Sequence, residues 1–379
     1  MPFRRPAVML RAMNAAAETR ADPRPAFAVS LPVYGYAECV AEALTSLAVQ
    51  DWPVRAALLD ATPDQSVQVA SRGFEDLLAW GYHHADGGQS AAINAGWRNL
   101  PGEILAWLNA DDLLFPDTLP LVGALFAAHP EIDVVWGHAV HVTFDGRFVE
   151  YFPAVSSRPE DLRRGCTIAQ PSCFVRRRAI EKAGFLDEAR HYTMDWDLWC
   201  RLLESGARFR FLDRPLSLVR LHGDSKTASG ASRRFAEIAE IARRQAGPLA
   251  GRLVEWRFRA GHLAEGSALL RLIRGATRAL RPARRLFGID AWTNRVQDSC
   301  VLHLAWLRPA PPIRLMLRAD RPGAYRATVA GRLVEGVAEA DGAVGFALPP
   351  LPVPGRIEIG LARADGTAWR LSSAWLEGG

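Results

Sequence analysis

Two adjacent carboxylates are the sharpest chemical signal in this 379-residue sequence. Asp111 and Asp112 come shortly after Ile104–Leu108, a short apolar run typical of a buried strand. Two carboxylates at a strand end cannot both be core residues, because an unpaired buried charge is costly. They either cap the following helix, or hold a hard divalent cation against a substrate diphosphate. The pair alone leaves both interpretations open.

Two other expected strands also end in residues that could contact a ligand. Ala26–Val33 is followed by Tyr34, and Arg55–Asp60 ends on a carboxylate. A helical spacing of apolar residues lies between them, at Ala37–Val49. Alternating strands and helices predict an α/β domain around a largely parallel sheet, and a later Asp-Gly hairpin signal adds antiparallel strands. Such sheets bind ligands beyond the carboxyl ends of their strands, so these three ends define the candidate site.

Several further segments match one family in order. Over residues 26–227 the sequence resembles glycosyltransferase family 2, which has the GT-A fold, a Rossmann-like mixed sheet flanked by helices. Besides the three strand ends, the resemblance rests on DGGQSAAINAG (86–96), NADD (109–112), QPSCF (170–174), GFLDE (184–188), MDWDLW (194–199) and RLHGDSKT (220–227).

This resemblance implies a site for a nucleotide sugar, with Mg²⁺ or Mn²⁺ bridging its diphosphate. The implied metal ligands are Asp111 and His222. Gln170 fits a plain strand residue nearly as well as a sugar contact. The implied nucleotide-sugar contacts are Pro32, Tyr34, Asp60, Asp86, Gln89, Asn94, Asn109, Asp112, Gln170, Trp196 and Lys226.

The resemblance also implies that Asp195 is the catalytic base, which takes a proton from the acceptor hydroxyl. Single displacement of this kind inverts the anomeric configuration. Partial burial beside Trp196 and Trp199 would keep its pKa in a useful range. The alternative is a helix N-terminal carboxylate that complements the macrodipole.

The chain departs from the family pattern at two positions. Pro63 stands where the family has a hydroxyl residue, which leaves the role of Asp64 open. Asn109 replaces the commoner aspartate, so Asp111 is expected to be the main ligand of the metal. Lys226 is one of only two lysines and is expected to contact the phosphates, whereas Lys182 is expected at the surface.

Arginine dominates the basic residues, and it is concentrated in one region. Residues 231–300 carry fourteen arginines against six acidic residues, whereas the rest of the chain is slightly acidic, which argues against a nucleic-acid binder. We expect either a helical packing layer here or a peripheral membrane contact through 268–287, with Leu286 and Phe287 on its apolar side. The expected organisation is a leader (1–25), a GT-A domain (26–230), this basic helical region (231–305) and a small β-rich domain (306–379) joined by Pro309–Pro312.

Five cysteines without a CxxC pair, and no signal-peptide core or membrane-spanning run, predict a cytoplasmic protein, peripheral at most to the inner face of a membrane. The function expected is an inverting, metal-dependent transferase that uses a nucleotide sugar, favouring a UDP-sugar. Its acceptor would be a hydroxyl of a glycan or lipid-linked acceptor in surface polysaccharide biosynthesis. One alternative is a non-catalytic glycan-binding or assembly protein that retains the fold. Another is a sugar-phosphate nucleotidyltransferase, which would need a glycine-rich basic loop after the first strand.

Overall fold

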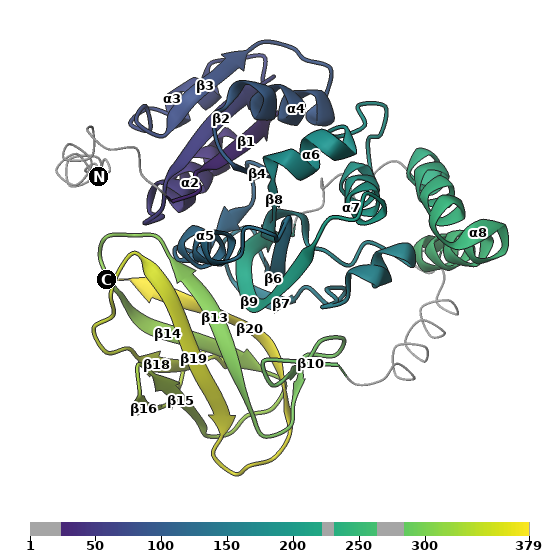
Figure 1. Ribbon diagram of the computed structural model, residues 1–379. Helices are drawn as coiled ribbons and strands as arrows, with labels where there is room; N and C mark the ends of the chain where they lie inside the picture. Colours follow the sequence, from purple (N-terminus) through teal and green to yellow (C-terminus); the bar gives the residue numbers. More distant parts are fainter. Residues whose placement is uncertain (1–23, 222–230, 264–283, 379) are drawn as a thin grey trace.

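The computed structural model describes residues 24–221, 231–263 and 284–378 (Figure 1). Its first part is built on a mixed sheet, as the sequence predicted. Its strands are β1 (Phe27–Val33), β2 (Val54–Asp60), β3 (Leu78–His83), β4 (Ile104–Trp107), β5 (Leu113–Leu114), β6 (Val134–Val142), β7 (Phe148–Tyr151), β8 (Cys173–Arg176) and β9 (Phe209–Arg220). The order β6-β8-β4-β1-β2-β3 is parallel from β4 to β3, and β8 runs antiparallel to β4 and β6.

Helices cover both faces of this sheet. They are α2 (Ala37–Ala48), α3 (Ser66–Ala70), α4 (Gln89–Asn99), α5 (Thr118–Ala128), α6 (Arg177–Ala183), α7 (Met194–Glu204) and α8 (Ala231–Leu263), with short 3₁₀ turns η1 (Pro159–Arg163) and η2 (Gln170–Ser172). Because side chains alternate along a strand, Phe27 and Val29 pack in one core with α2 and α5, whereas Ala28 packs in the other with α4 and α7. Buried faces on both sides explain why the parallel strands appear as nearly continuous apolar runs.

Helix α4 lies unusually close to β1. A Cβ at Gly96 would come within 2.2 Å of Ser30 Oγ, so only glycine permits the contact. Ser30 uses that proximity to donate a hydrogen bond to the Ile93 carbonyl at 3.1 Å. The close packing fixes the N-terminus of α4, which faces the carboxyl ends of the strands. The expected core positions of Trp97, Trp107 and Trp136 are confirmed, since each is at most 2% exposed.

The C-terminal part is β-rich and lies below the α/β part in Figure 1. Its strands are β10 (Arg285–Leu286), β11 (Ile289–Asp290), β12 (Arg295–Val296), β13 (Ser299–Trp306), β14 (Pro312–Ala319), β15 (Tyr325–Val329), β16 (Arg332–Glu335), β17 (Val337–Ala338), β18 (Val344–Ala347), β19 (Gly355–Arg363) and β20 (Trp369–Gly378). Strands thus occupy 285–306, where we expected a helical region. The proline run connects β13 to β14 within this part, so it is not the linker that we predicted.

The two parts share one sheet and a dense seam. Strand β20 pairs with β7 at Ala374 and Phe148, which joins the C-terminal strands to the first sheet. Arg356 also forms an ion pair with Asp117 at 2.7 Å, and its guanidinium lies over the Phe115 ring. The β-rich part is therefore packed against the α/β part as one continuous structure.

The proposed apolar membrane side at 268–287 is wrong at its C-terminal end. Leu286 is 7% exposed, and Phe287 packs against Tyr151 and His303 at ring-centroid distances of 4.8 and 4.6 Å. Both side chains belong to the core of the β-rich part and cannot face a lipid surface. Residues 268–283 lie outside the described residues. Within the part that the structure describes, no helix is long and apolar enough to cross a membrane.

His303 makes the seam sensitive to acid. It is 2% exposed, and burial, followed by the nearby Arg356 and Arg214, lowers its pKa from 6.5 to about 3. Between pH 6.5 and about 3, His303 is therefore protonated in the unfolded chain but neutral in the folded protein. The free energy of unfolding falls as the pH drops through this range, because protons bind preferentially to the unfolded state. Between pH 7.5 and 5.0 the free energy of unfolding should fall by about 2 kcal/mol more in the wild type than in His303→Gln. Urea denaturation at both pH values measures this difference, and an equal fall in both proteins would contradict it.

Candidate active site

The carboxyl ends of the parallel strands meet at one edge of the sheet. Val33 lies opposite Asp60 in the β1–β2 register, so the loops after the two strands start side by side. The Gly35 amide donates to Thr62 Oγ1 at 3.0 Å and ties these loops together. Tyr34 is 77% exposed at this edge, and Pro32 is partly buried. The structure thus brings together the first two of the three predicted strand ends.

Asp60 lies beneath the site surface. Its carboxylate is buried and accepts hydrogen bonds from the Thr62 amide at 2.8 Å and from the Gln68 side chain. His83 Nδ1 lies 2.8 Å from the same carboxylate, and the His83 side chain is 29% exposed. We expected Asp60 to contact the base or ribose directly. Its buried carboxylate instead orients Thr62 and His83. His83 is the group presented outward, and sequence reasoning missed it together with β3, none of whose residues is fully buried.

The loop between β3 and α4 carries the next predicted residue, Asp86. It accepts hydrogen bonds from the Tyr82 hydroxyl and from the Gly88 amide, both at 2.8 Å. The Tyr82 ring stacks on His84 at a centroid distance of 4.3 Å. Burial, with a further contribution from Asp86, raises the pKa of Tyr82 far above the usual phenol value, so the hydroxyl stays a donor. Asp86 thus shapes a loop with a stacked aromatic pair.

An amide relay links α4, the end of β4 and η2. Gln89 Nε2 donates to Asn109 Oδ1 at 2.8 Å. Asn109 Nδ2 donates in turn to Asp112 at 3.1 Å and to Gln170 Oε1 at 3.2 Å, and Gln170 Nε2 donates to the Trp107 carbonyl at 2.8 Å. An aspartate at position 109 could accept from Gln89 but could not donate to either partner. The relay therefore gives a physical reason for the asparagine.

The two carboxylates that follow the relay differ in environment. Asp112 is 4% exposed, and burial, followed by the charge of Asp111, raises its pKa well above the ordinary value. Hydrogen bonds from Asn109 and from the Arg220 backbone hold the Asp112 carboxylate in place. Asp111 is half-buried, and Arg220 donates to its carbonyl at 3.3 Å. Asp111 is thus the outer carboxylate of the pair, and Asp112 has a supporting position.

One outer carboxylate beside a buried one suits a hard cation that takes its other ligands from phosphates and water. Within the described ranges, no three His, Cys, Asp or Glu side chains come together as an all-protein metal site. His222 and Lys226, the other predicted ligands of the diphosphate and its metal, lie outside the described residues.

Asp195 is the second residue of α7 and sits partly buried where that helix begins. Its Oδ1 accepts a hydrogen bond from the Trp196 amide at 2.7 Å, and the Cys166 thiol lies 3.8 Å from Oδ2. Burial raises the pKa of Asp195, against hydrogen bonds to the carboxylate that lower it. A carboxylate with a raised pKa is a stronger base than an ordinary aspartate.

Two predicted contacts are instead core residues. Trp196 is 2% exposed and donates its indole N–H to the Leu162 carbonyl at 2.7 Å, and its neighbour Trp199 stacks on Trp107. Asn94 is 1% exposed; its amide donates to the Leu186 carbonyl at 2.9 Å and accepts from the Leu186 amide at 3.0 Å. Neither Trp196 nor Asn94 reaches the site surface. Both hold α7 and the loop before it against the sheet.

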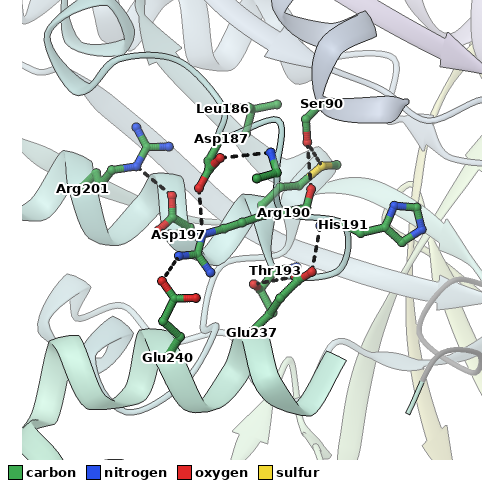
Figure 2. Close-up of polar contacts among 12 residues, drawn as sticks. Ser90, Leu186, Asp187, Arg190, His191, Thr193, Asp197, Arg201, Glu237 and Glu240 are labelled. Atoms are coloured by element: carbon green, nitrogen blue, oxygen red, sulfur yellow. Dashed lines mark hydrogen bonds and ion pairs between the residues drawn. The ribbon is translucent and has the colours of Figure 1, made fainter. Parts of the chain in front are cut away.

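Helix α8 holds the loop that leads into α7 (Figure 2). The Glu237 carboxylate accepts hydrogen bonds from the amides of His191, Tyr192 and Thr193 at 2.9 to 3.0 Å, and from the Thr193 hydroxyl at 3.1 Å. Despite its burial, these bonds lower the pKa of Glu237 and keep it charged. A residue 44 to 46 positions further along the sequence thus fixes the start of the helix that carries Asp195.

Ion pairs of Arg190 with α7 and α8 hold the same loop (Figure 2). Arg190 is 8% exposed; its guanidinium lies 3.3 Å from Asp197 and 2.7 Å from Glu240 on α8. Arg201 and Arg244 add ion pairs to Asp197 at 2.7 and 2.9 Å. The buried charge of Asp197 is therefore surrounded by three guanidinium groups.

Glu237→Ala should lower turnover by about ten- to a hundredfold without weakening donor binding. The variant removes every acceptor for three amides, so the start of α7 shifts, and a misplacement of about 1 Å can cost that much in rate. Arg243→Ala is the matched control, because Arg243 is an exposed residue of the same helix and lies outside the contacts to this loop. Turnover and donor affinity are measured for both, and equal losses would show that the Glu237 contacts do not position the base.

Comparison with known families identifies the first part of the chain. Residues 28–185 match the model of glycosyl transferase family 2. The chain is 27% identical over 232 residues to an uncharacterized glycosyltransferase of Rickettsia typhi, which covers 56% of this chain and 69% of that protein. Residues 28–185 are a glycosyltransferase family 2 domain.

Other similarities are more limited in length or depth. An O-antigen biosynthesis protein of Myxococcus xanthus is 27% identical over 149 residues, 39% of this chain and 11% of that protein. The structure of S. aureus TarS residues 1–349 in complex with UDP-GlcNAc aligns with a TM-score of 0.49 and 18% identity, over 63% of this chain and 73% of that one. The mannosyltransferase PcManGT of Pyrobaculum calidifontis, solved with GDP-Man and Mn²⁺, aligns with a TM-score of 0.43 and 18% identity, over 72% and 86%.

The GT-A fold expected for the family 2 domain is confirmed by the family match together with the mixed sheet and its flanking helices. The family match ends at Phe185, so Asp195 and the α8 contacts lie beyond it. Sequence reasoning missed His83, the Arg190 cluster and Glu237. Only Glu237 had a visible signal, as one of two acidic residues in the basic helical segment 231–246.

Proposed function

We propose that the chain is an inverting glycosyltransferase that moves a sugar from a nucleotide sugar to a hydroxyl of an acceptor. The observation that carries this proposal is the position of Asp195 at the start of α7. The carboxyl group is partly buried and has a raised pKa, and Glu237 of α8 holds the residues just before it. A UDP-sugar is the donor that we favour. The acceptor proposed is a glycan or a lipid-linked sugar of surface polysaccharide, handled on the cytosolic side of the membrane.

The donor half of the proposal rests on the edge where β1, β2 and β4 end. Tyr34 and His83 offer ring faces and polar atoms for a base and ribose, and Asp86 holds the loop between them and α4. The amide relay through Gln89 and Asn109 fixes the side chains next to the proposed position of the diphosphate. These groups bind and orient the donor, and none of them needs to change its protonation state.

The acceptor half rests on Asp195. The carboxylate takes the proton of the acceptor hydroxyl while the hydroxyl oxygen bonds to the anomeric carbon and the nucleoside diphosphate leaves with the bonding electrons. The attack comes from the face opposite the leaving group, so the configuration inverts. The Trp196 amide and the Cys166 thiol steady the two oxygens of the base during this step.

Asp111, supported by Asp112, would hold a divalent cation, Mg²⁺ or Mn²⁺. When bound there, such a cation supplies Lewis-acid neutralisation of the charge on the departing diphosphate. The chain's own contribution is the Asp111 carboxylate. Arg220 holds this residue by donating a hydrogen bond to the Asp111 backbone carbonyl.

A thermal-shift screen of nucleoside diphosphate sugars, with and without Mn²⁺, tests the donor site. At least one nucleotide sugar should raise the melting temperature, and Mn²⁺ should increase that shift, because a ligand that binds only the folded state stabilises it. If no nucleotide or nucleotide sugar stabilises the protein under either condition, the donor-site proposal fails.

A non-catalytic glycan-binding or assembly protein with the same fold is the competing function. Its support was the pair of departures at Pro63 and Asn109. The relay accounts for Asn109, so no contact described for this site favours the competing function over catalysis.

A further inference from the structure

Helix α8 has two halves with opposite environments, which Figure 1 shows as two segments at an angle. Gly247, with φ of 78°, and Pro248 interrupt the helix between them. In the first half the apolar side chains are buried against the family 2 domain; they are Ile238, Ala239, Ile241 and Ala242, each at most 3% exposed.

The second half presents apolar side chains outward instead. Leu249 is 76% exposed, Leu253 is 62% exposed and Trp256 is 69% exposed. Their spacing of four and then three residues places them on one side of a helix. We call these three residues the α8 face. Single exposed apolar residues are common, but three large ones in a stripe on successive turns mark an interaction surface.

The charge around the α8 face indicates what covers it. Arg252 is exposed within the same two turns. The second half of α8, from 249 to 263, contains three arginines and one acidic residue. Two copies of so basic a segment would repel each other, whereas an anionic lipid surface would attract it. Leucine and tryptophan on one side of a short helix, together with arginine, are the composition of helices that lie in the membrane interface.

We propose that the α8 face docks on an anionic membrane surface, with Leu249, Leu253 and Trp256 entering the interface and arginines contacting the headgroups. The inference rests on exposure and charge and does not depend on the proposed function. Because Glu237 and Glu240 of the same helix hold the loop before Asp195, docking would also fix the orientation of the catalytic edge relative to the membrane. A lipid-linked acceptor would then reach a site of defined direction.

Vesicle co-sedimentation of the full chain tests the proposal. Vesicles of phosphatidylcholine with phosphatidylglycerol should bind the wild type at least tenfold more tightly than vesicles of phosphatidylcholine alone, and added salt should weaken the binding. Leu253→Glu should lower the affinity for anionic vesicles at least tenfold. Leu333→Glu is the matched control, since Leu333 on β16 is 63% exposed and should be silent.

Circular dichroism melting and a donor thermal shift check that both variants stay folded and that the donor site is unchanged. Failure of the wild type to bind anionic vesicles would overturn the proposal, as would equal binding by Leu253→Glu and Leu333→Glu. Concentration-dependent dimers that Leu253→Glu abolishes, without vesicle binding, would overturn it in favour of a second copy of the chain. Donor binding with no vesicle binding would reject the membrane surface and leave the proposed function standing.

Discussion

Replacing Asp195 with asparagine should reduce sugar transfer by about 10²- to 10⁴-fold, the usual contribution of a general base. Donor binding should persist. The amide keeps the shape of the side chain and can still accept the hydrogen bond from the Trp196 amide, but it cannot take a proton. Turnover is measured as release of nucleoside diphosphate with water as the acceptor, and donor affinity by calorimetry.

The pH profile provides a second readout of the same residue. Only the ionised carboxylate can take the acceptor proton, so turnover should fall as the pH drops through the pKa that burial has raised. Asp195→Asn should lose this acid limb. The exposed Asp341 of the β-rich part supplies a control, and Asp341→Asn should leave both rate and profile unchanged. Transfer at the wild-type rate by Asp195→Asn would remove Asp195 as the base.

Replacing Asp111 with asparagine should weaken Mn²⁺-dependent donor binding by about ten- to a hundredfold. The estimate follows from the loss of one charge-assisted contact of about 1.5 to 3 kcal/mol, at 1.4 kcal/mol for each factor of ten. Calorimetric titration of the nucleotide sugar in the presence and absence of Mn²⁺ measures the effect. The affinity without the cation should change little, because the base and ribose contacts lie at other strand ends.

Asp112→Asn is the matched comparison for that experiment. Asp112 is buried with a raised pKa, and it accepts hydrogen bonds from Asn109 and from the Arg220 backbone that an amide oxygen can also accept. Its replacement should therefore affect the Mn²⁺-dependent affinity much less than Asp111→Asn. Equal losses in the two variants would show that Asp111 is not the main protein ligand of the cation.

The parallel core of the family 2 domain could be predicted because its strands are buried on both faces. Continuous apolar runs at β1, β2 and β4 left little ambiguity, and the structure confirms them to within a residue or two. The β3 strand escaped prediction, since none of its residues is fully buried. His83 was missed for the same reason, because only the pairing of β3 with β2 brings it against Asp60.

The motif residues could be located from the sequence, but their burial could not. Asp60, Asn94 and Trp196 stand at the positions that the family pattern marks, yet each side chain turns inward to protein partners. A pattern of residue types gives position along the chain, whereas the choice between ligand and support depends on packing. Asn109 shows the converse: an apparent weakness in the pattern is explained by two acceptors, one of them sixty-one residues away.

Long-range contacts of α8 were also beyond the sequence. A basic helical segment predicted either packing or a membrane surface, and the two halves of α8 separate these alternatives. The half that packs contributes Glu237 to the start of α7. The exposed half carries the α8 face, whereas Leu286 and Phe287, which we had placed on a lipid-facing side, belong to a protein core.

The anomeric configuration of the first product tests the central claim most directly. A donor with an α-linked sugar that stabilises the protein is incubated with it, and the released sugar is followed by proton NMR before it mutarotates. Single displacement with Asp195 as the base predicts that the β-anomer appears first in the wild type and that Asp195→Asn releases almost none. Early appearance of the α-anomer would contradict the account.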